Sequence, residues 1–285
     1  MSLFKNQQGK IRGFWKISVW LILVVVLSVG GAHLMTNLAI PAAQYGMACR
    51  YAEAGDTENA ILAFRALGTY RDSESRITEM LFNRQSLAFD NLQVGSTFCM
   101  GLYEQDGIAN GPEEIEWIVL SVEGSKALVI SKYALDAKPY HETFSKVTWA
   151  DCSLRQWLNA DFYPNAFSGV QQSRIQLTVT PADKNPEYDT PVGEDTTDRI
   201  LLLSVTEVER YLTDTPYAAC LVTPYAVQNR AYRTTIYGCW WWCRTPGDRE
   251  TFAVGVDPIG NISIVGNNVN YVHGAVRPAM WISID

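Results

Sequence analysis

An uninterrupted apolar run lies near the start of the chain. Residues 17–40 contain no Asp, Glu, Lys or Arg, whereas residues 1–16 contain basic residues and no acidic ones. About 20 apolar residues cross a bilayer core as a helix, and a basic flank stays in the cytoplasm. The pattern predicts a cytoplasmic basic tail over 1–16 and a transmembrane signal-anchor helix over 17–40. It places the remaining chain on the extracytoplasmic side of the cell membrane.

A cleaved signal peptide is the alternative to this anchor. Gly30, Gly31 and Ala32 match the small residues of a cleavage site. The apolar run continues past Ala32 to Ile40, which favours a retained anchor. Both interpretations export the rest of the chain.

Apolar positions take the helical period over residues 41–90. Tyr45, Ala48, Cys49 and Ala52 follow the spacing i, i+3, i+4, i+7. After a break at Gly55, a second helix is predicted from Thr57, with Ala60, Ile61, Phe64 and Leu67 on one face. A third helix is predicted through Ile77, Met80 and Leu81. The segment 41–90 is therefore predicted to be a short all-α helical-hairpin stalk.

Beyond residue 91 the pattern changes to short strands and turns. Two apolar runs, 116–122 and 127–131, flank a Gly-containing turn and predict a hairpin. The runs 252–256 and 261–265 predict a second hairpin, and 200–203 reads as a buried strand. Ser204 and Glu207 form a capping box that starts a helix. Strands at both ends with helices between them predict an α+β domain over 91–285.

Charge and cysteine content narrow the functional classes. The formal net charge is −7 and no basic stripe offsets it, which excludes nucleic acid as a partner. The six cysteines are an even number, which permits disulfides outside the cytoplasm. No pair has the CxxC spacing of a zinc ribbon or a thioredoxin site. The count does not demand them, because a buried free Cys is a common small hydrophobic residue. Structural bridges to other partners are favoured for Cys239 and Cys243, and no cofactor is predicted.

Two motifs lie near the C-terminus, WWxRxPG and then VRPAxWI. They contain Trp241, Trp242, Arg244, Pro246, Gly247, Arg277 and Pro278. This set of motifs resembles a domain of unknown function common in Gram-positive gut bacteria. The resemblance extends over about residues 94–283. That family often carries a single-pass anchor and a short helical segment ahead of the domain. The sequence departs from the family pattern at Cys243 and at Ala275, and the first departure favours a bridged Cys243.

The family is similar to the C-type-lectin-like fold of formylglycine-generating enzymes and of the variable proteins of diversity-generating retroelements. The resemblance implies this fold for residues 91–285, and fold alone implies no function. Residues 48–68 also resemble a tetratricopeptide-type hairpin of about one and a half repeats. A stalk or cap is the favoured interpretation of that hairpin, and a peptide-binding groove is the alternative.

The resemblance also directs attention to the polar turns near the C-terminus. In the retroelement-diversified relatives this general region displays the binding residues, and Asn and Tyr suit adaptable recognition. The predicted ligand-binding residues are Asn261, Asn267, Asn268, Asn270, Tyr271 and His273. Plain polar turns are the alternative interpretation. For Trp241, Trp242, Arg244 and Arg277, a structural role in the core is favoured over a ligand platform.

Metal and redox chemistry have weaker support. Asp189, Glu194 and Asp195 lie in an acidic loop that is a candidate Ca²⁺ site, but the Glu-Pro-Asn triplet of many C-type lectins is absent. A solvated acidic loop is favoured, so no metal is predicted. Formylglycine-generating enzymes use a cysteine pair with copper, and Cys239 and Cys243 are the corresponding candidates. Other motifs of that class are not recognisable, so no catalytic residue is predicted.

These observations predict a membrane-anchored, extracytoplasmic and non-catalytic binding or adhesion module. Its expected ligand is a surface glycan or a protein. The alternatives are a copper-dependent oxidase of the formylglycine-generating type and a structural subunit of an envelope complex.

Overall fold

The computed structural model describes residues 39–85, 89, 92–234 and 238–285. The predicted tail over 1–16 and almost all of the predicted transmembrane helix over 17–40 lie outside these residues. Within the described ranges, no helix is both long enough and apolar enough to cross a membrane. The chain divides into two compact units, Met1–Ile77 and Thr78–Asp285. The division falls inside a helix, ahead of the boundary expected near residue 90.

The first unit contains the helices α2 (Ile40–Glu53) and α3 (Thr57–Arg65) and the start of α4 (Ser73–Arg84). A proline occupies the first turn of α2, where its missing N–H costs nothing. The side chain of Asp56 caps α3 by accepting a hydrogen bond from the backbone N–H of Asn59 at 3.3 Å. Helices are therefore present where the period predicted them.

Aromatic packing holds the first unit together. The rings of Tyr45 and Phe64 meet edge to face with centroids 5.5 Å apart. The Tyr45 hydroxyl donates to Asp72 and accepts from Arg76 Nε at 3.0 Å. The predicted apolar face of α3 is buried at Ala60, Ile61 and Phe64. Leu67 was expected on that face, but α3 ends at Arg65 and Leu67 is only half-buried in the following turn.

The second unit is an α+β domain, as the sequence predicted. Its first sheet has the order β1-β2-β3-β14, formed by Thr97–Tyr103, Glu113–Glu123, Lys126–Ser131 and Ala279–Ser283. The hairpin of β2 and β3 turns at Gly124, whose φ of +59° suits a residue without a Cβ. Strand β14 pairs antiparallel with β3, with Trp281 opposite Leu128. The chain therefore returns at its end to the sheet where the domain began.

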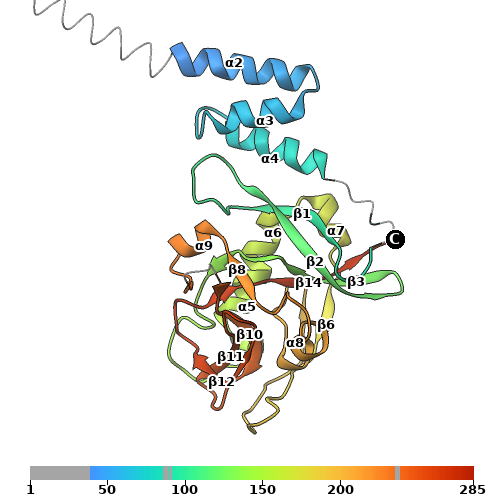
Figure 1. Cartoon of the computed structure of the whole chain (residues 1–285), viewed down its shortest axis with the longest axis vertical. Helices are drawn as coiled ribbons and strands as arrows, with labels where there is room; N and C mark the ends of the chain where they lie inside the picture. Colours follow the sequence, from blue (N-terminus) through green and yellow to red (C-terminus); the bar gives the residue numbers. More distant parts are fainter. Residues whose placement is uncertain (1–38, 86–88, 90–91, 235–237) are drawn as a thin grey trace, which may run out of the picture. The chain divides into compact units, whose positions relative to one another are not determined.

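A second sheet has the order β12-β11-β10-β13-β5. Its strands are β5 (Asp136–Ala137), β10 (Trp241–Pro246), β11 (Phe252–Val256), β12 (Ile262–Asn268) and β13 (Ala275–Val276). The predicted hairpin is present as β11 and β12, and it turns at Gly260 with a φ of +98°. Figure 1 shows β1–β3 and β10–β12 at opposite ends of the second unit.

Two smaller sheets complete the strand inventory of the described residues. One joins β4 (Tyr133–Ala134), β8 (Cys220–Val222) and β9 (Gly238–Cys239), and the other joins β6 (Thr178–Thr180) to β7 (Thr196–Asp198). The run 200–203 is buried as expected, but it is not a strand. Leu201 forms an isolated bridge with Ala279, while the carbonyls of Leu202 and Leu203 accept hydrogen bonds from Arg244. Its backbone groups are hydrogen-bonded to residues of two different strands, β10 and β14, so the run does not pair along its length with either strand.

Short helices connect many of the strands along the chain. They are α5 (Ser153–Trp157), the π-helical η3 (Leu158–Phe162), α6 (Tyr163–Ala166), α7 (Gly169–Arg174), α8 (Val205–Tyr211) and α9 (Pro224–Gln228), with the 3₁₀ turn η2 (Trp149–Asp151) before them. The predicted capping box is present at α8. Ser204 N donates to Glu207 Oε2 at 2.9 Å, and Glu207 N donates to Ser204 Oγ at 3.2 Å.

The bridge favoured for Cys243 is corrected by the structure, in which all six cysteines are free thiols. Four of them are buried in the second unit: Cys152, Cys220, Cys239 and Cys243. A buried thiol behaves as a small hydrophobic side chain. Burial raises the pKa of Cys243, so this residue packs as a neutral thiol where a bridge was favoured.

Candidate functional site

The predicted ligand-binding residues do not form one group. Asn267 and Asn268 end β12, and Asn270, Tyr271 and His273 follow in the turn before β13. Asn261 lies before the other end of β12. A seven-residue strand is about 20 Å long, so Asn261 is separated from the rest. The candidate surface therefore comprises residues 267–273 and what packs against them.

Trp240 joins this surface, although the sequence interpretation did not include it among the binding residues. Its ring contacts Tyr271 with centroids 6.1 Å apart at 90°, and Tyr271 contacts His273 at 5.1 Å. All three residues are half-buried. We call Trp240, Tyr271 and His273 the aromatic platform. The run of three Trp in the sequence gave no sign that Trp240 lies beside Tyr271.

Two glycines fix the position of Trp240. A Cβ at Gly255 would lie 2.4 Å from Trp240 Cε2, and a Cβ at Gly274 would lie 2.6 Å from Trp240 Cζ3. The same Cβ at Gly274 would lie 2.0 Å from Trp242 Nε1. Any larger residue at these positions displaces an indole ring, so the platform depends on close approach of backbone to ring.

The hydrogen bonds of His273 define its neutral tautomer. Its Nδ1 lies 2.7 Å from the carbonyl oxygen of Arg230. A carbonyl oxygen only accepts, so Nδ1 carries the hydrogen and Nε2 of the neutral ring is an acceptor. The backbone N–H of Tyr232 donates a hydrogen bond to the carbonyl oxygen of His273 at 3.0 Å, which holds His273 in place. The platform thus combines ring faces with a defined polar edge.

The motif residues are placed in the core. Trp241 and Trp242 are fully buried, and their indole N–H groups donate to the carbonyls of Ala218 and Lys138 at 3.1 and 2.9 Å. Arg244 is 4% exposed and its guanidinium binds Glu207. Pro246, Gly247 and Pro278 are also buried. These contacts give the two indole N–H groups and the Arg244 guanidinium a structural role.

Arg277 is the most enclosed charge of the motif, with 1% of its surface exposed. Its Nε donates to Ser131 O at 3.0 Å, and one terminal nitrogen donates to Tyr217 O at 2.7 Å. The guanidinium lies over the Trp241 ring at 5.1 Å. Within the described residues its contacts are thus carbonyl groups and a ring face rather than a carboxylate.

The calcium candidates Asp189, Glu194 and Asp195 are exposed. Asp195 Oδ1 accepts a hydrogen bond from Ala182 N at 2.8 Å, which ties it to its own loop. Among the described residues, the carboxylates that meet within 4.8 Å of one another belong to a different set: Glu104, Asp106 and Glu113. Oxygen ligands of this kind suit a hard cation such as Ca²⁺, but exposed acidic groups are common without one.

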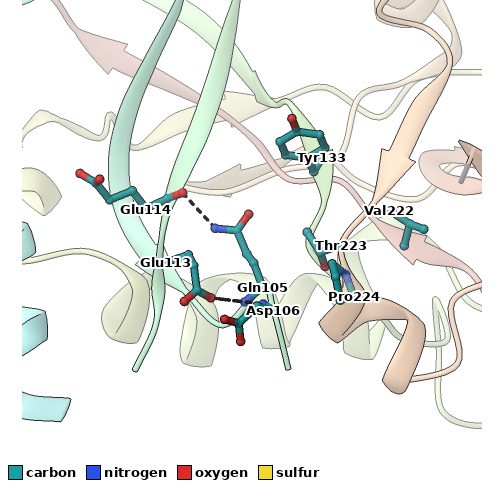
Figure 2. Close-up of a pocket in the computed structure, with 8 residues that line it drawn as sticks. All are labelled: Gln105, Asp106, Glu113, Glu114, Tyr133, Val222, Thr223 and Pro224. Atoms are coloured by element: carbon teal, nitrogen blue, oxygen red, sulfur yellow. Dashed lines mark hydrogen bonds between the residues drawn. The ribbon is translucent and has the colours of Figure 1, made fainter. Parts of the chain in front are cut away.

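Two of these acidic residues line a pocket of about 280 Å³, drawn in Figure 2. The pocket lies where β1 and β2 open, opposite β4, the end of β8 and the start of α9. Its lining residues are Gln105, Asp106, Glu113, Glu114, Tyr133, Val222, Thr223 and Pro224. The sequence interpretation missed this pocket because its two walls are about 110 residues apart in the chain.

Hydrogen bonds organise the acidic wall of the pocket. Glu113 Oε2 accepts from the backbone N–H of Gln105 at 2.8 Å, and Gln105 Nε2 donates to Glu114 O at 2.9 Å (Figure 2). Burial raises the pKa of Glu104, and the nearby charges of Glu113 and Asp106 raise it further. The wall therefore concentrates negative charge at one end of the pocket.

Comparison with known protein families assigns the second unit. Residues 124–284 match a family described as Domain of unknown function (DUF6273). The chain belongs to this family. The DUF6273 range runs from the turn before β3 to the residue after β14 and includes the aromatic platform and every motif residue. It leaves Glu104, Asp106 and Glu113 outside. Neither the comparison with curated proteins nor the comparison with solved structures gave a match.

Proposed function

We propose that this DUF6273 protein is a membrane-anchored, extracytoplasmic binding module that recognises a surface glycan on its aromatic platform. The observation that carries the proposal is the row of Trp240, Tyr271 and His273, in which the Tyr271 ring contacts both of its neighbours and all three residues are half-buried. Sugar rings have apolar C–H faces and a rim of hydroxyl groups. A row of ring faces bordered by hydrogen-bonding groups complements both.

The neighbouring amides supply the polar part of such a site. Asn267 and Asn268 are half-buried at the end of β12, and Asn270 is half-buried in the turn. The Asn267 side chain is held by the backbone N–H of Asn268, which donates to Oδ1 at 2.8 Å. An amide has both donors and acceptors, so these residues can bind a sugar hydroxyl that donates a hydrogen bond or one that accepts it.

The proposed fold supports the same function. We propose that residues 91–285 adopt a C-type-lectin-like arrangement, in which the last strand returns beside an early one and a second sheet carries the ligand. The pairing of β14 with β3 and the location of the platform, just before β10 and in the turn between β12 and β13, favour this assignment. The resemblance is an analogy of fold, so the binding claim depends on the platform itself.

The N-terminal helices give the proposed module its position. We propose that residues 17–40 anchor the chain and that the tetratricopeptide-like helices spanning 41–90 act as a stalk. The anchor is tested by fractionation: the intact N-terminus is expected in the membrane fraction. A mature form that starts near residue 33 and leaves the membrane would show cleavage instead.

A glycan array probed with the detergent-solubilised full chain tests the binding proposal. We expect selective binding to a subset of glycans, which the free sugar competes away. Binding only to proteins from cell-surface material would favour the protein-ligand alternative, and no binding in either assay would favour a structural subunit. Copper-dependent oxidation of a cysteine-containing peptide would favour the oxidase alternative, but the structure sets Cys239 opposite Cys220 rather than Cys243.

A further inference from the structure

Two of the buried thiols face each other across a pair of strands. Cys220 begins β8 and Cys239 ends β9, and the antiparallel register places them directly opposite. Directly opposite residues in an antiparallel pair have Cα atoms about 4.5 to 5.5 Å apart. Disulfides bridge Cα atoms that are about 4.4 to 6.8 Å apart. The register therefore places the two residues at a Cα spacing that a disulfide can bridge.

No other described cysteine has this arrangement in the strand pairings. Cys99 in β1 lies opposite Glu116. Cys243 in β10 falls within an irregular stretch of the pairing with β11, between Trp242 and Pro246. Cys152 caps α5 by accepting from the backbone N–H of Arg155. Among the buried thiols that the structure describes, the strand register therefore places Cys220 and Cys239 opposite each other and gives Cys152 and Cys243 no such partner.

We propose that Cys220 and Cys239 form a disulfide between β8 and β9, made by thiol–disulfide exchange with a disulfide oxidant. The inference goes beyond the binding function and does not depend on it. Both sulfur-bearing residues are enclosed, with 1% and 0% of their surfaces exposed. The exchange therefore takes place while the domain folds or when this small sheet opens locally.

The surroundings decide which thiol attacks first. Burial opposes ionisation of Cys220, but a hydrogen bond from Cys239 and the positive charge of Arg277 outweigh it and lower the pKa of Cys220. The same contact and burial raise the pKa of Cys239. Cys220 is thus the more acidic thiol of the pair, so its deprotonated form is the first nucleophile.

The chemistry balances with the oxidant as the acceptor of two electrons. The Cys220 thiolate attacks one sulfur of the oxidant's disulfide, forms a mixed disulfide and expels the other sulfur as a thiolate. Cys239 then loses its proton, attacks Cys220 Sγ and expels the second thiolate. The two protons released by the cysteines end on the two thiols of the reduced oxidant. One S–S bond is broken and one is formed.

The bridge would act on the strand that leads into the aromatic platform. Cys239 immediately precedes Trp240, and β8 pairs in parallel with β4. A link from Cys239 to Cys220 therefore ties the start of the Trp run to the three-stranded sheet. It also closes a chain segment of 20 residues, 220–239, and so removes freedom from the unfolded chain.

Peptide mapping of the full chain in detergent tests the proposal. The protein is refolded in the presence of oxidised glutathione, alkylated and digested with trypsin without reduction. Cleavage after Arg230 and Arg233 separates Cys220 from Cys239 but leaves Cys239 with Cys243. Digestion of the Cys243→Ser variant therefore assigns the linkage. We expect a linked pair of peptides, and the alkylated thiols of the wild-type chain to fall from six to four.

Two matched variants complete the test. Cys220→Ser should abolish the linked peptide and leave Cys239 alkylated, whereas Cys152→Ser should leave the link intact. Reduction of the wild-type protein should lower its Tm by several degrees. The proposal is overturned if all six wild-type thiols remain alkylated after oxidative refolding. A linkage of Cys220 to another cysteine would overturn it equally, and both results come from the wild-type map, whatever the fold of a variant.

Discussion

Glu207 binds the guanidinium of Arg244 with the same carboxylate that caps α8. One oxygen, Oε2, accepts from both Ser204 N and Arg244 Nη1, and Oε1 accepts from Arg244 Nη2 at 3.1 Å. The arginine is 4% exposed, and the glutamate side chain is 26% exposed. A helix start and a buried charge are thus satisfied by one residue.

Replacing Glu207 should destabilise the domain strongly. Glu207→Ala removes the partner of a buried guanidinium and half of a capping box. Loss of one partner of a buried pair costs about 3 to 5 kcal/mol. Urea unfolding followed by Trp fluorescence measures the change. The exposed Glu209→Ala on the same helix is the control, with an expected change within about 0.5 kcal/mol. Equal effects of the two variants would contradict the structural role.

The aromatic platform predicts which variants lose glycan binding. Tyr271→Ala removes the central ring of the row and should weaken binding to an array-selected glycan by about tenfold or more, the equivalent of about 1.4 kcal/mol. Asn270→Ala should weaken it less. Asn261→Ala is the matched control at the other end of β12 and should bind as the wild type does. Binding measured by calorimetry that falls equally for Asn261→Ala and Tyr271→Ala would place the site elsewhere.

Gly274 should tolerate no side chain. Its Cβ in Gly274→Ala would lie within 3 Å of the indoles of both Trp240 and Trp242, so the rings must shift. Overpacking of this kind costs about 1 to 3 kcal/mol. A lower Tm and a changed Trp fluorescence spectrum are expected. Gly169→Ala is the control, because nothing lies within 4 Å of its added Cβ. An unchanged spectrum for Gly274→Ala would contradict the close packing of the platform.

The acidic wall predicts a pH-dependent stability difference. Burial, with the charges of Glu113 and Asp106, raises the pKa of Glu104, so the folded state binds its proton more tightly than the unfolded chain. This group therefore stabilises the fold as the pH falls through its folded pKa and is unfavourable at neutral pH. Glu104→Gln should stabilise the fold at pH 7 slightly and so raise the Tm. The gain should be less than about 1 kcal/mol, because the side chain is partly exposed and solvent screens its charge.

The same comparison at low pH separates charge from packing. Below about pH 4 both forms of residue 104 are neutral, so the difference between Glu104→Gln and wild type should vanish. Glu142→Gln, at an exposed position, should show little difference at either pH. If Glu104→Gln is still more stable than the wild type at low pH, the carboxylate charge is not the cause of the difference.

Local sequence patterns predicted many of the helices, turns and caps. They did not predict which segments pair when these are far apart in the chain. The helix from Thr57, the hairpin around Gly124 and the cap at Ser204 each depend on residues close in sequence, and all three are present. The run 200–203 was predicted as a strand because it is apolar, but hydrogen bonds from Arg244 and Ala279 use its backbone separately. Apolar composition reports burial, and it does not report which partner binds the backbone.

The site was harder to predict for the same reason. Tyr271 and His273 were identified from their residue types, but Trp240 joins them only through the fold, and Asn261 is separated by the length of β12. The opposition of Cys220 to Cys239 is a register, which no spacing within one segment reveals. Likewise, Gln105 meets Tyr133 and Thr223 in a pocket whose walls come from distant strands.

The adjacency of β3 and β14 has a consequence for how the domain is made. Some 150 residues separate the two strands, so the first sheet stays incomplete until residues 279–283 have left the ribosome. Until then β3 presents an unpaired edge of apolar residues to any other strand it meets. A chain cut shortly before Ala279 would keep every other strand and still be prone to aggregate, because its bare edge would remain a template for a neighbouring copy.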